Sequence, residues 1–239
     1  DSNQVVRKGE TGTPEYIESE AQKLGLKTIR VDLDGQFRCG GSRLYENWIA
    51  GMLKLEGNSP FPWEEDPNFI VQVVDSPQDM ERLLRGKNEE GYKARITAGY
   101  CWTWNDPRED GTLPNDVVIG NWAKPWNVKS DRAVGGYLSG ELWAIDPKGF
   151  DQIGCVYTVQ GFEYDWNGVI LGPDLVWRKD KWIAVPIGSK DPAMRGVEPS
   201  RYERLIKNTY KVLLTRGLVG TYLFSVDNET QEYLQSMVT

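Results

Sequence analysis

The sequence contains no histidine among its 239 residues, and this absence excludes several kinds of catalysis. Ser-His-Asp and Cys-His mechanisms need an imidazole to move the proton, and His-ligated zinc sites need it as a ligand. Cysteine is scarce too, since Cys39, Cys101 and Cys155 lie far apart and without metal-ligand spacing. We therefore expect no metal site, reduced thiols and a cytoplasmic protein, with any chemistry left to carboxylates, arginines, amides and backbone groups.

Long apolar runs and positive charge are also in short supply. No stretch approaches the roughly 18 consecutive apolar residues of a membrane span, so we expect no membrane partner. No signal peptide leads the chain, and Asp1 in place of methionine suggests a start within a longer protein. The 28 Lys and Arg against 35 Asp and Glu leave a formal net charge of -7. This balance counts against a large nucleic-acid-binding face but allows a local basic groove.

Strand-like and helix-like segments alternate along most of the chain. Apolar runs predict strands at 26–33, 69–74, 94–98, 153–157, 168–171 and 221–226. Caps and apolar periodicity predict helices that begin near Thr13, Ser42 and Ser76, and helices over 201–214 and 229–237. This alternation predicts an α/β fold with a mainly parallel sheet flanked by helices.

Two segments interrupt the alternation. Residues 100–150 form a Trp-rich, Gly- and Pro-containing stretch that we interpret as an irregular insertion, and 172–199 as a second loop or hairpin. Tryptophans can stack on unpaired bases, but buried ones more often fill a core or hold a long loop in place. We interpret the following as structural: Trp102, Trp104, Trp122 and Trp126. The carboxylates Asp106, Glu109 and Asp110 fit a solvated turn, because no spacing defines a ligand set.

The phosphate-binding Walker A loop is missing as well. Its pattern of Gly, any four residues and Gly-Lys-Ser/Thr does not occur, so by that route the chain cannot hold a triphosphate alone. The segment 157–163 offers other ligand groups, since Gly161 lets the backbone approach a ligand closely. Its neighbours Gln160 and Glu163 suit a hydroxyl group or a phosphate-bound water.

Two further segments hold an arginine at the end of a regular element. Arg216 follows a predicted helix and precedes a strand, where its guanidinium can reach phosphate oxygens across an interface. Arg38 lies between a strand and a helix beside the ring of Phe37. Both positions are typical of groups that bind phosphate.

Taken in order, four segments resemble motifs of superfamily 1 DNA/RNA helicases. Residues 1–4 resemble the end of motif III, 36–38 motif IV, 158–163 motif V and 210–216 motif VI. The nearest resemblance is to a family of bacterial helicase-like P-loop ATPases known only as a domain of unknown function, which the Trp-rich insertion also resembles. The resemblance covers most of the chain and implies a RecA-like P-loop NTPase fold.

The resemblance implies that residues 1–239 are the second, C-terminal RecA-like domain of a helicase-type ATPase. Residues 1–25 would be a boundary segment, and 100–150 and 172–199 would be insertions. ATP and Mg²⁺ would bind between this domain and an N-terminal RecA-like domain of the same protein, while DNA or RNA crosses both. The fragment alone would then be inactive.

The resemblance also implies roles for single residues. Phosphoryl transfer needs positive charge on the γ-phosphate, so Arg216 would be the arginine finger and Arg38 a second phosphate-binding arginine. Gln4 would sense the γ-phosphate. The residues expected to contact the nucleotide are Gln36, Phe37, Gln160, Gly161 and Glu163, and the one expected to contact nucleic acid is Thr158.

Each of these residues also has a simpler interpretation. Arg216 would balance the C-terminal end of its helix, a common role for a basic residue there. Arg38 would form a surface ion pair, Gln160 and Glu163 would be ordinary polar loop residues, and Phe37 would belong to the core.

Two alternative functions stay open for the chain as a whole. Ten Trp, eleven Tyr and an acidic balance also suit a Trp-rich module that binds carbohydrate or protein without catalysis. Such modules are often all-β, and the predicted alternation of strands and helices counts against one. A degenerate helicase half that only mediates protein contact is the other alternative.

Overall fold

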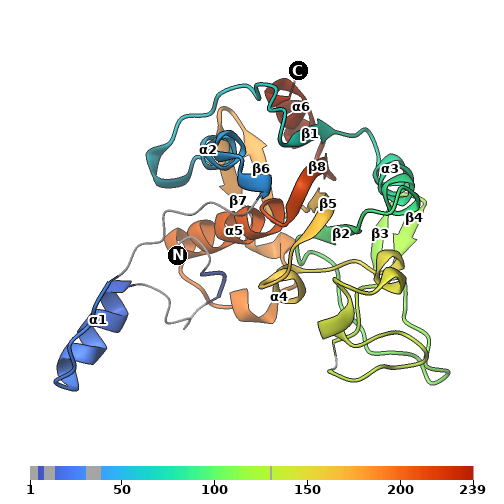
Figure 1. Ribbon diagram of the computed structural model, residues 1–239, viewed down its shortest axis with the longest axis horizontal. Helices are drawn as coiled ribbons and strands as arrows, with labels where there is room; N and C mark the ends of the chain where they lie inside the picture. The colour runs from blue at the N-terminus through green and yellow to red at the C-terminus, as the bar shows by residue number, and fades with distance from the viewer. Residues whose placement is uncertain (1–4, 8–13, 31–38, 130, 239) are drawn as a thin grey trace.

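A four-stranded parallel sheet forms the centre of the protein (Figure 1). The computed structural model describes residues 5–7, 14–30, 39–129 and 131–238. In their order across the sheet, the strands are β1 (Ile70–Val73), β8 (Gly217–Ser225), β5 (Tyr164–Leu171) and β2 (Ala94–Ala98). Each pairs in parallel with its neighbour, so all four strands begin at one edge and end at the opposite one.

Side chains alternate between the two faces of the sheet and build two separate hydrophobic cores. In β5, Val169 and Leu171 belong to one core, while Ile170 between them belongs to the other. In β8, Leu223 and Tyr222 divide in the same way. Burial on both faces explains why these strands read as almost continuous apolar runs.

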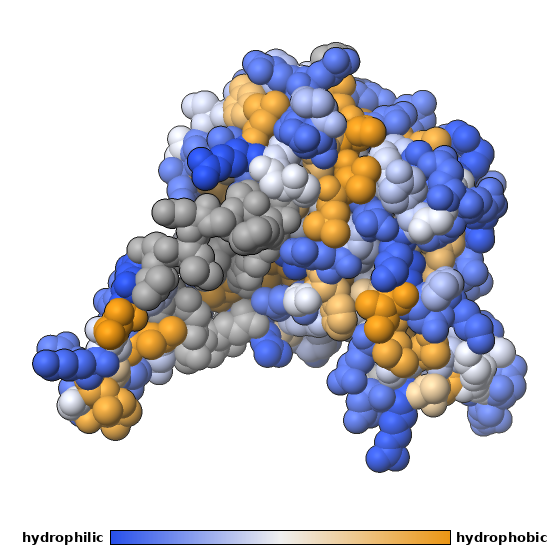
Figure 2. Space-filling model, in the orientation of Figure 1, coloured by the Kyte–Doolittle hydropathy of each residue, from blue (hydrophilic) through white to orange (hydrophobic). Residues whose placement is uncertain are grey.

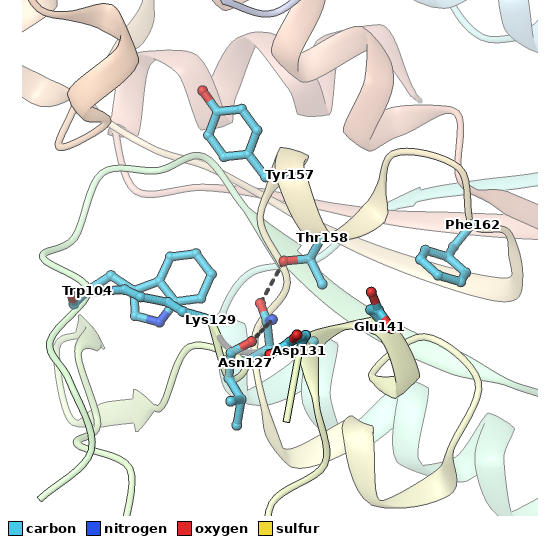
Figure 3. A pocket seen from close by; sticks show the side chains of 10 residues that line it. Trp104, Asn127, Lys129, Asp131, Glu141, Tyr157, Thr158 and Phe162 are labelled. Atoms are coloured by element: carbon cyan, nitrogen blue, oxygen red, sulfur yellow. Dashed lines mark hydrogen bonds between the residues drawn. The ribbon is translucent and has the colours of Figure 1, made fainter. Parts of the chain in front are cut away.

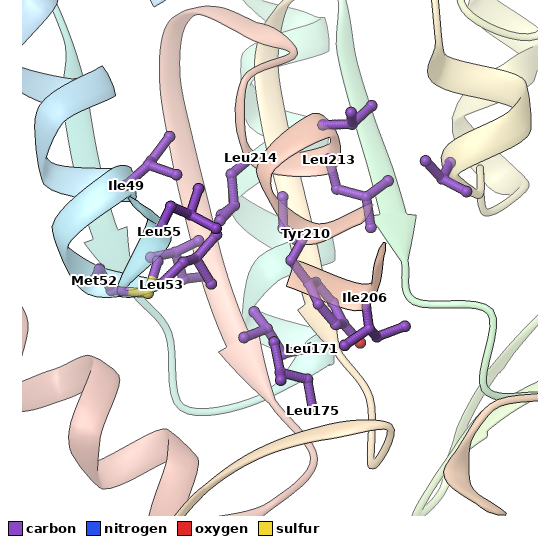
Figure 4. Close-up of a cluster of buried hydrophobic side chains, with 14 of the residues drawn as sticks. Ile49, Met52, Leu53, Leu55, Leu171, Leu175, Ile206, Tyr210, Leu213 and Leu214 are labelled. Carbon is purple, nitrogen blue, oxygen red and sulfur yellow. The ribbon is translucent and has the colours of Figure 1, made fainter. Parts of the chain in front are cut away.

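Three helices and a hairpin cover the first face, where α2 and α5 pack beside β5 (Figure 4). These elements are α2 (Arg43–Met52), α5 (Pro199–Leu214), α6 (Asn228–Met237) and the antiparallel pair β6 (Leu175–Arg178) and β7 (Lys181–Ala184). Ile206, Tyr210 and Leu213 of α5 enter the core at the helical spacing that the sequence predicts. The Tyr45 hydroxyl in α2 donates to the carbonyl of Leu214, which ties the two helices together at a distance of 3.0 Å.

Helix α3 (Pro77–Glu89) covers the second face. Its predicted cap is present, because the Ser76 hydroxyl oxygen accepts a bond of 3.0 Å from the backbone N–H of Asp79. The helix packs so closely on β5 that a Cβ atom on Gly168 would lie 2.6 Å from Leu84 and 2.7 Å from Met80. Glycine at this position therefore sets how near the helix approaches the sheet.

The Trp-rich insertion packs beside α3 and β2. It contains the short antiparallel pair β3 (Val117–Ile119) and β4 (Trp122–Lys124). Glu81 of α3 accepts hydrogen bonds from the Trp122 indole at 2.7 Å and the Lys124 ammonium at 2.8 Å. Trp122 and Trp126 are buried in the second core, whereas Trp102 and Trp104 are half-buried against it. These contacts agree with the structural role predicted for the tryptophans.

The remaining helical elements are short or exposed. They are α1 (Pro14–Lys23), α4 (Val156–Val159) and the 3₁₀ turns Cys39–Gly41, Leu55–Gly57, Gly140–Leu142, Pro147–Asp151, Pro186–Gly188 and Pro192–Met194. None of the residues of α1 is buried, and apolar side chains are exposed on it and just after it (Figure 2). α1 therefore contributes to neither core.

The predicted mixed α/β architecture, a parallel sheet flanked by helices, is confirmed. The strand predicted at 153–157 is wrong, because only Ile153 and Gly154 form single bridges and a helical turn, α4, follows. Residues 26–30 of the strand predicted at 26–33 lie outside any helix or strand. The segment 172–199 does contain a hairpin, and its turn residues Lys179 and Asp180 both adopt positive φ. The RecA-like assignment stays a prediction.

Asp227 provides a test of this fold through pH. Its carboxylate oxygens accept hydrogen bonds of 2.6 and 2.7 Å from the Arg178 guanidinium. The same carboxylate caps α6 by accepting from the Thr230 N–H. The bond from Arg178 is the largest cause that lowers the pKa of Asp227, which is about 2. Because the pKa of Asp227 is lower in the folded state than in the unfolded state, its ionisation stabilises the fold at pH values above the unfolded pKa of 3.8. This stabilisation is lost as the pH falls through the folded pKa of about 2. Asp227→Asn should therefore lower the free energy of unfolding by about 1 kcal/mol at pH 7.

Urea unfolding of both proteins between pH 7 and pH 2 measures this difference. The gap between the wild type and Asp227→Asn should narrow as the pH falls below 3.8. A gap that stays constant over this range would contradict the assigned ion pair.

Candidate functional site

Two of the segments that the sequence singles out meet at the edge where β5 and β8 begin. Residues 160–163 lead into β5, and Thr215 and Arg216 lead into β8. The first residues of the two strands pair, Tyr164 with Gly217, and the Tyr164 N–H donates to the carbonyl of Arg216 at 3.2 Å. Segments about fifty residues apart in sequence thus form one surface, which we call the β5–β8 edge.

The guanidinium of Arg216 joins these two segments. Its Nε donates to the carbonyl of Val212 at 2.8 Å, and Nη1 donates to the carbonyl of Phe162 at 3.3 Å. Nη2 donates to the hydroxyl oxygen of Thr215 at 3.2 Å, and only 3% of the residue is exposed. In this arrangement Arg216 holds the last turn of α5 against the loop before β5, which corresponds to the helix-end interpretation. Contact with a phosphate requires an exchange of these partners, so the arginine-finger role stays a prediction.

The loop before β5 turns at Gly161. Its φ of +99° is one that side-chain-bearing residues rarely adopt, although no atom lies within 4 Å of where a Cβ would be. The turn leaves Gln160 and Glu163 exposed on the β5–β8 edge, and both interact with other groups of the protein. The ligand-contacting roles of Gln160, Gly161 and Glu163 are compatible with this exposure and stay predictions.

The described residues that follow the motif IV-like segment pack near the same edge. Gln36, Phe37 and Arg38 lie outside the described residues, as does Gln4. The next residues, Cys39–Gly41, pack at the start of β8, where a Cβ on Gly40 would lie 2.5 Å from the carbonyl oxygen of Leu218. Among the described residues, the segments that resemble motifs V and VI are therefore adjacent, and Cys39–Gly41 pack nearby at the start of β8.

A cleft of ≈ 380 Å³ lies beside this edge. Thr158 and Phe162 line it on the side of α4, and Trp104 and Lys129 of the insertion line it opposite (Figure 3). The Thr158 hydroxyl donates to the side-chain oxygen of Asn127 at 2.8 Å. This bond orients the residue predicted to contact nucleic acid, and a ligand in the cleft would meet both side chains.

A second hollow of ≈ 600 Å³ shares Trp104 and Lys129 with the cleft. Its other wall is the loop 186–197, which the Lys190 N–H joins to the carbonyl of Tyr100, just after β2, at 2.8 Å. Crevices beyond the carboxyl ends of parallel strands are common ligand sites. Sequence reasoning missed Lys190 and Arg195 of this loop, since no motif or periodicity distinguishes them.

Tyr157 connects the two hollows. Its hydroxyl donates to Asp191 at 2.6 Å, and burial together with that carboxylate raises the pKa of Tyr157 well above its usual value. The phenol therefore stays protonated and acts as a fixed donor, not as an acid or base near neutral pH.

Within the ranges that the structure describes, no three His, Cys, Asp or Glu side chains gather as a metal site. The described helices include none that is long and apolar enough to cross a membrane. All three cysteines are buried and free.

Comparison with known proteins identifies two similarities. Residues 1–227 match the family described as Schlafen group 3, DNA/RNA helicase domain. The chain is also 25% identical over 222 residues to an uncharacterized protein of Saccharomyces cerevisiae, YPL245W, and this match covers 84% of the chain. The chain spans about half of that relative, 47% of its length.

Gly161 provides a test of the loop geometry. Gly161→Ala should lower the free energy of unfolding by about 1–2 kcal/mol, because the added Cβ meets no neighbour but cannot easily adopt a positive φ. The matched control is Gly86→Ala in α3, where open space and ordinary helical geometry predict a gain of up to about 1 kcal/mol. Chemical denaturation of the two variants should give opposite signs, and stabilisation by Gly161→Ala would contradict the described turn.

Proposed function

The chain belongs to the Schlafen group 3 DNA/RNA helicase domain family, and from this premise we propose that it is one half of a nucleic-acid-dependent ATPase. It serves as the second RecA-like domain, and ATP with Mg²⁺ binds between it and an N-terminal RecA-like domain of the same protein. DNA or RNA crosses both domains. ATP turnover then drives closure of the two halves on the strand.

The observation that carries this proposal is the convergence at the β5–β8 edge. A bond from Arg216 to the carbonyl of Phe162 joins segments 54 residues apart, and these are the segments that resemble motifs VI and V. Phosphoryl transfer needs little covalent chemistry from the protein and depends on positioning and positive charge. An edge that carries an arginine, a turn glycine and the exposed Gln160 and Glu163 suits that task when a second domain supplies the phosphate-binding loop.

Closure of the two halves gives Arg216 its proposed role as arginine finger. Three of its hydrogen bonds go to neutral acceptors, the carbonyls of Val212 and Phe162 and the hydroxyl of Thr215, and it interacts with a further group as well. A γ-phosphate oxygen carries the opposite charge that these three acceptors lack, and it can accept bidentate bonds from the guanidinium. Arg38 and Gln4 complete the phosphate contacts, while Gln36, Phe37, Gln160, Gly161 and Glu163 contact the nucleotide and Thr158 contacts nucleic acid.

The fold does not favour the alternative of a non-catalytic, Trp-rich binding module. The buried parallel sheet with helices on both faces differs from the all-β architecture common in such modules. Most of the insertion's tryptophan surface contributes to packing, as in the stacking of Trp104 on Trp126 with ring centres 5.5 Å apart.

Arg216 variants separate the finger role from the helix-end role. Arg216→Ala in the full-length protein should reduce nucleic-acid-stimulated ATP hydrolysis by about 10³-fold or more, and Arg216→Lys should also lose most activity because it lacks the planar fork. Arg201→Ala, an exposed position in the first turn of α5, is the control and should leave turnover unchanged. Steady-state turnover, normalised to the folded fraction, is the measurement.

A purely structural Arg216 would give a different pattern. Arg216→Ala would then lower the melting temperature, since the carbonyls of Val212 and Phe162 lose a donor, while the folded fraction kept normal turnover. That outcome would remove Arg216 from the proposed nucleotide site.

A further inference from the structure

The two hollows beside α4 are neighbours that share the lining residues Trp104 and Lys129. Both residues line the ≈ 380 Å³ cleft and the ≈ 600 Å³ hollow alike. We call the two neighbouring hollows together the Trp104 groove, and their lining residues extend from Thr158 near the β5–β8 edge to the loop 186–197 beyond β2.

Positive charge gathers in the second hollow, where Lys129, Lys190 and Arg195 line the space with Asp191, although the chain carries a net charge of -7. Lys190 and Arg195 are exposed in the second hollow, and neither forms an ion pair with any other residue that the structure describes. Lys129 at the junction forms a loose ion pair, 3.6 Å, with Asp106, whose side chain is 91% exposed, and it also donates to the carbonyl of Trp104. Exposed pairs of this kind contribute little, so all three cations are available to an anionic ligand.

The acidic groups of the groove are distributed unequally. In the second hollow, Asp191 accepts hydrogen bonds from the Tyr157 hydroxyl at 2.6 Å and from the Ala193 N–H at 2.8 Å. Its carboxylate is thus hydrogen-bonded by neutral donors, and it is outnumbered by the three cations that line the same hollow. Asp131 and Glu141 both line the first cleft. A polyanion is therefore bound best through Lys129 and the second hollow.

Trp104 provides an aromatic surface at the junction. Its ring stacks on the buried Trp126 at an interplanar angle of 30° and meets Tyr100 edge-on, with ring centres 5.6 Å apart. The indole is therefore held in place by two rings, and it lines both hollows. The Lys129 ammonium lies 5.5 Å from the ring centre and donates to the backbone carbonyl of the same residue.

From these observations we propose that the Trp104 groove binds single-stranded nucleic acid. A base stacks on Trp104, and backbone phosphates follow Lys129, Lys190 and Arg195. Stacking surfaces beside a positive groove are the usual means of binding single strands without strong sequence preference. The inference rests on the proposed function and assigns its strand a path through the Trp-rich insertion.

Fluorescence anisotropy with a fluorescein-labelled oligothymidylate tests the stacking contact. Trp104→Ala should weaken binding roughly 5- to 100-fold, as expected for one lost stacked base, and Trp104→Phe should restore most of it. Trp102→Ala is the matched control, because Trp102 is half-buried in the same insertion and also packs on Trp126, yet lines neither hollow. Equal losses in Trp104→Ala and Trp102→Ala would overturn the proposal.

Salt dependence tests the phosphate contacts. Arg195→Gln should reduce the slope of log Kd against log salt by about 0.7, the value for one phosphate contact to a single strand. Lys148→Gln, which removes an exposed cation of the insertion outside the groove, should leave the slope unchanged. Identical slopes for wild type and Arg195→Gln would contradict the assigned path.

Assays of the full-length protein distinguish a failure of the groove proposal from a failure of the proposed motor function. ATP hydrolysis that is stimulated by oligothymidylate to the same extent in wild type, Trp104→Ala and Arg195→Gln would overturn the groove and leave the ATPase intact. If Trp104→Ala and Arg195→Gln weaken oligothymidylate binding but the wild-type protein hydrolyses no ATP, the groove is supported and the proposed motor function is overturned.

Discussion

The parallel pairing of β5 with β8 is the constraint on which the candidate site depends. It sets Tyr164 opposite Gly217 and so brings the loop before β5 against the end of α5. Buried Asn167 reinforces the register, because its amide donates to the carbonyl of Leu213 at 2.9 Å and its oxygen accepts from the Tyr164 hydroxyl at 3.0 Å. A buried amide that is paired at both its nitrogen and its oxygen is costly to disrupt, which favours one alignment of strand and helix.

Close backbone contacts strengthen this pairing. A Cβ on Gly220 would lie 2.6 Å from the ring of Trp166, and one on Gly217 would lie 2.6 Å from the carbonyl oxygen of Gly220. Glycine therefore lets β8 lie tightly beside β5 just after Arg216. The arginine is thereby held at the β5–β8 edge, where only 3% of the residue is exposed.

Sequence patterns predict the alternation of elements better than the positions where strands begin. Helix α3 is found where its Ser76 cap indicates, because that signal is local. β5 begins at Tyr164 and β8 at Gly217, each four residues before the predicted starts. The sequence of residues 165–168, Asp-Trp-Asn-Gly, is typical of a turn. These residues are part of strand β5 instead, because Asn167 is held by a long-range hydrogen bond to the carbonyl of Leu213.

The candidate site is predictable only in part for the same reason. The sequence order identifies the segments that meet at the β5–β8 edge, whereas the burial of Arg216 depends on Val212 and Phe162, which no local pattern reveals. Lys190 and Arg195 become notable only when folding places their loop beside Trp104. Family membership supports a helicase-like protein, and the division of labour between its halves is our proposal.

The most direct measurement of the central claim compares ATP turnover by the 239-residue chain with turnover by the full-length protein. Both are assayed with saturating Mg²⁺-ATP, with and without single-stranded oligonucleotide. A site shared between two domains predicts negligible hydrolysis by the chain alone and stimulated hydrolysis by the full-length protein. Comparable turnover by the chain alone would contradict the account.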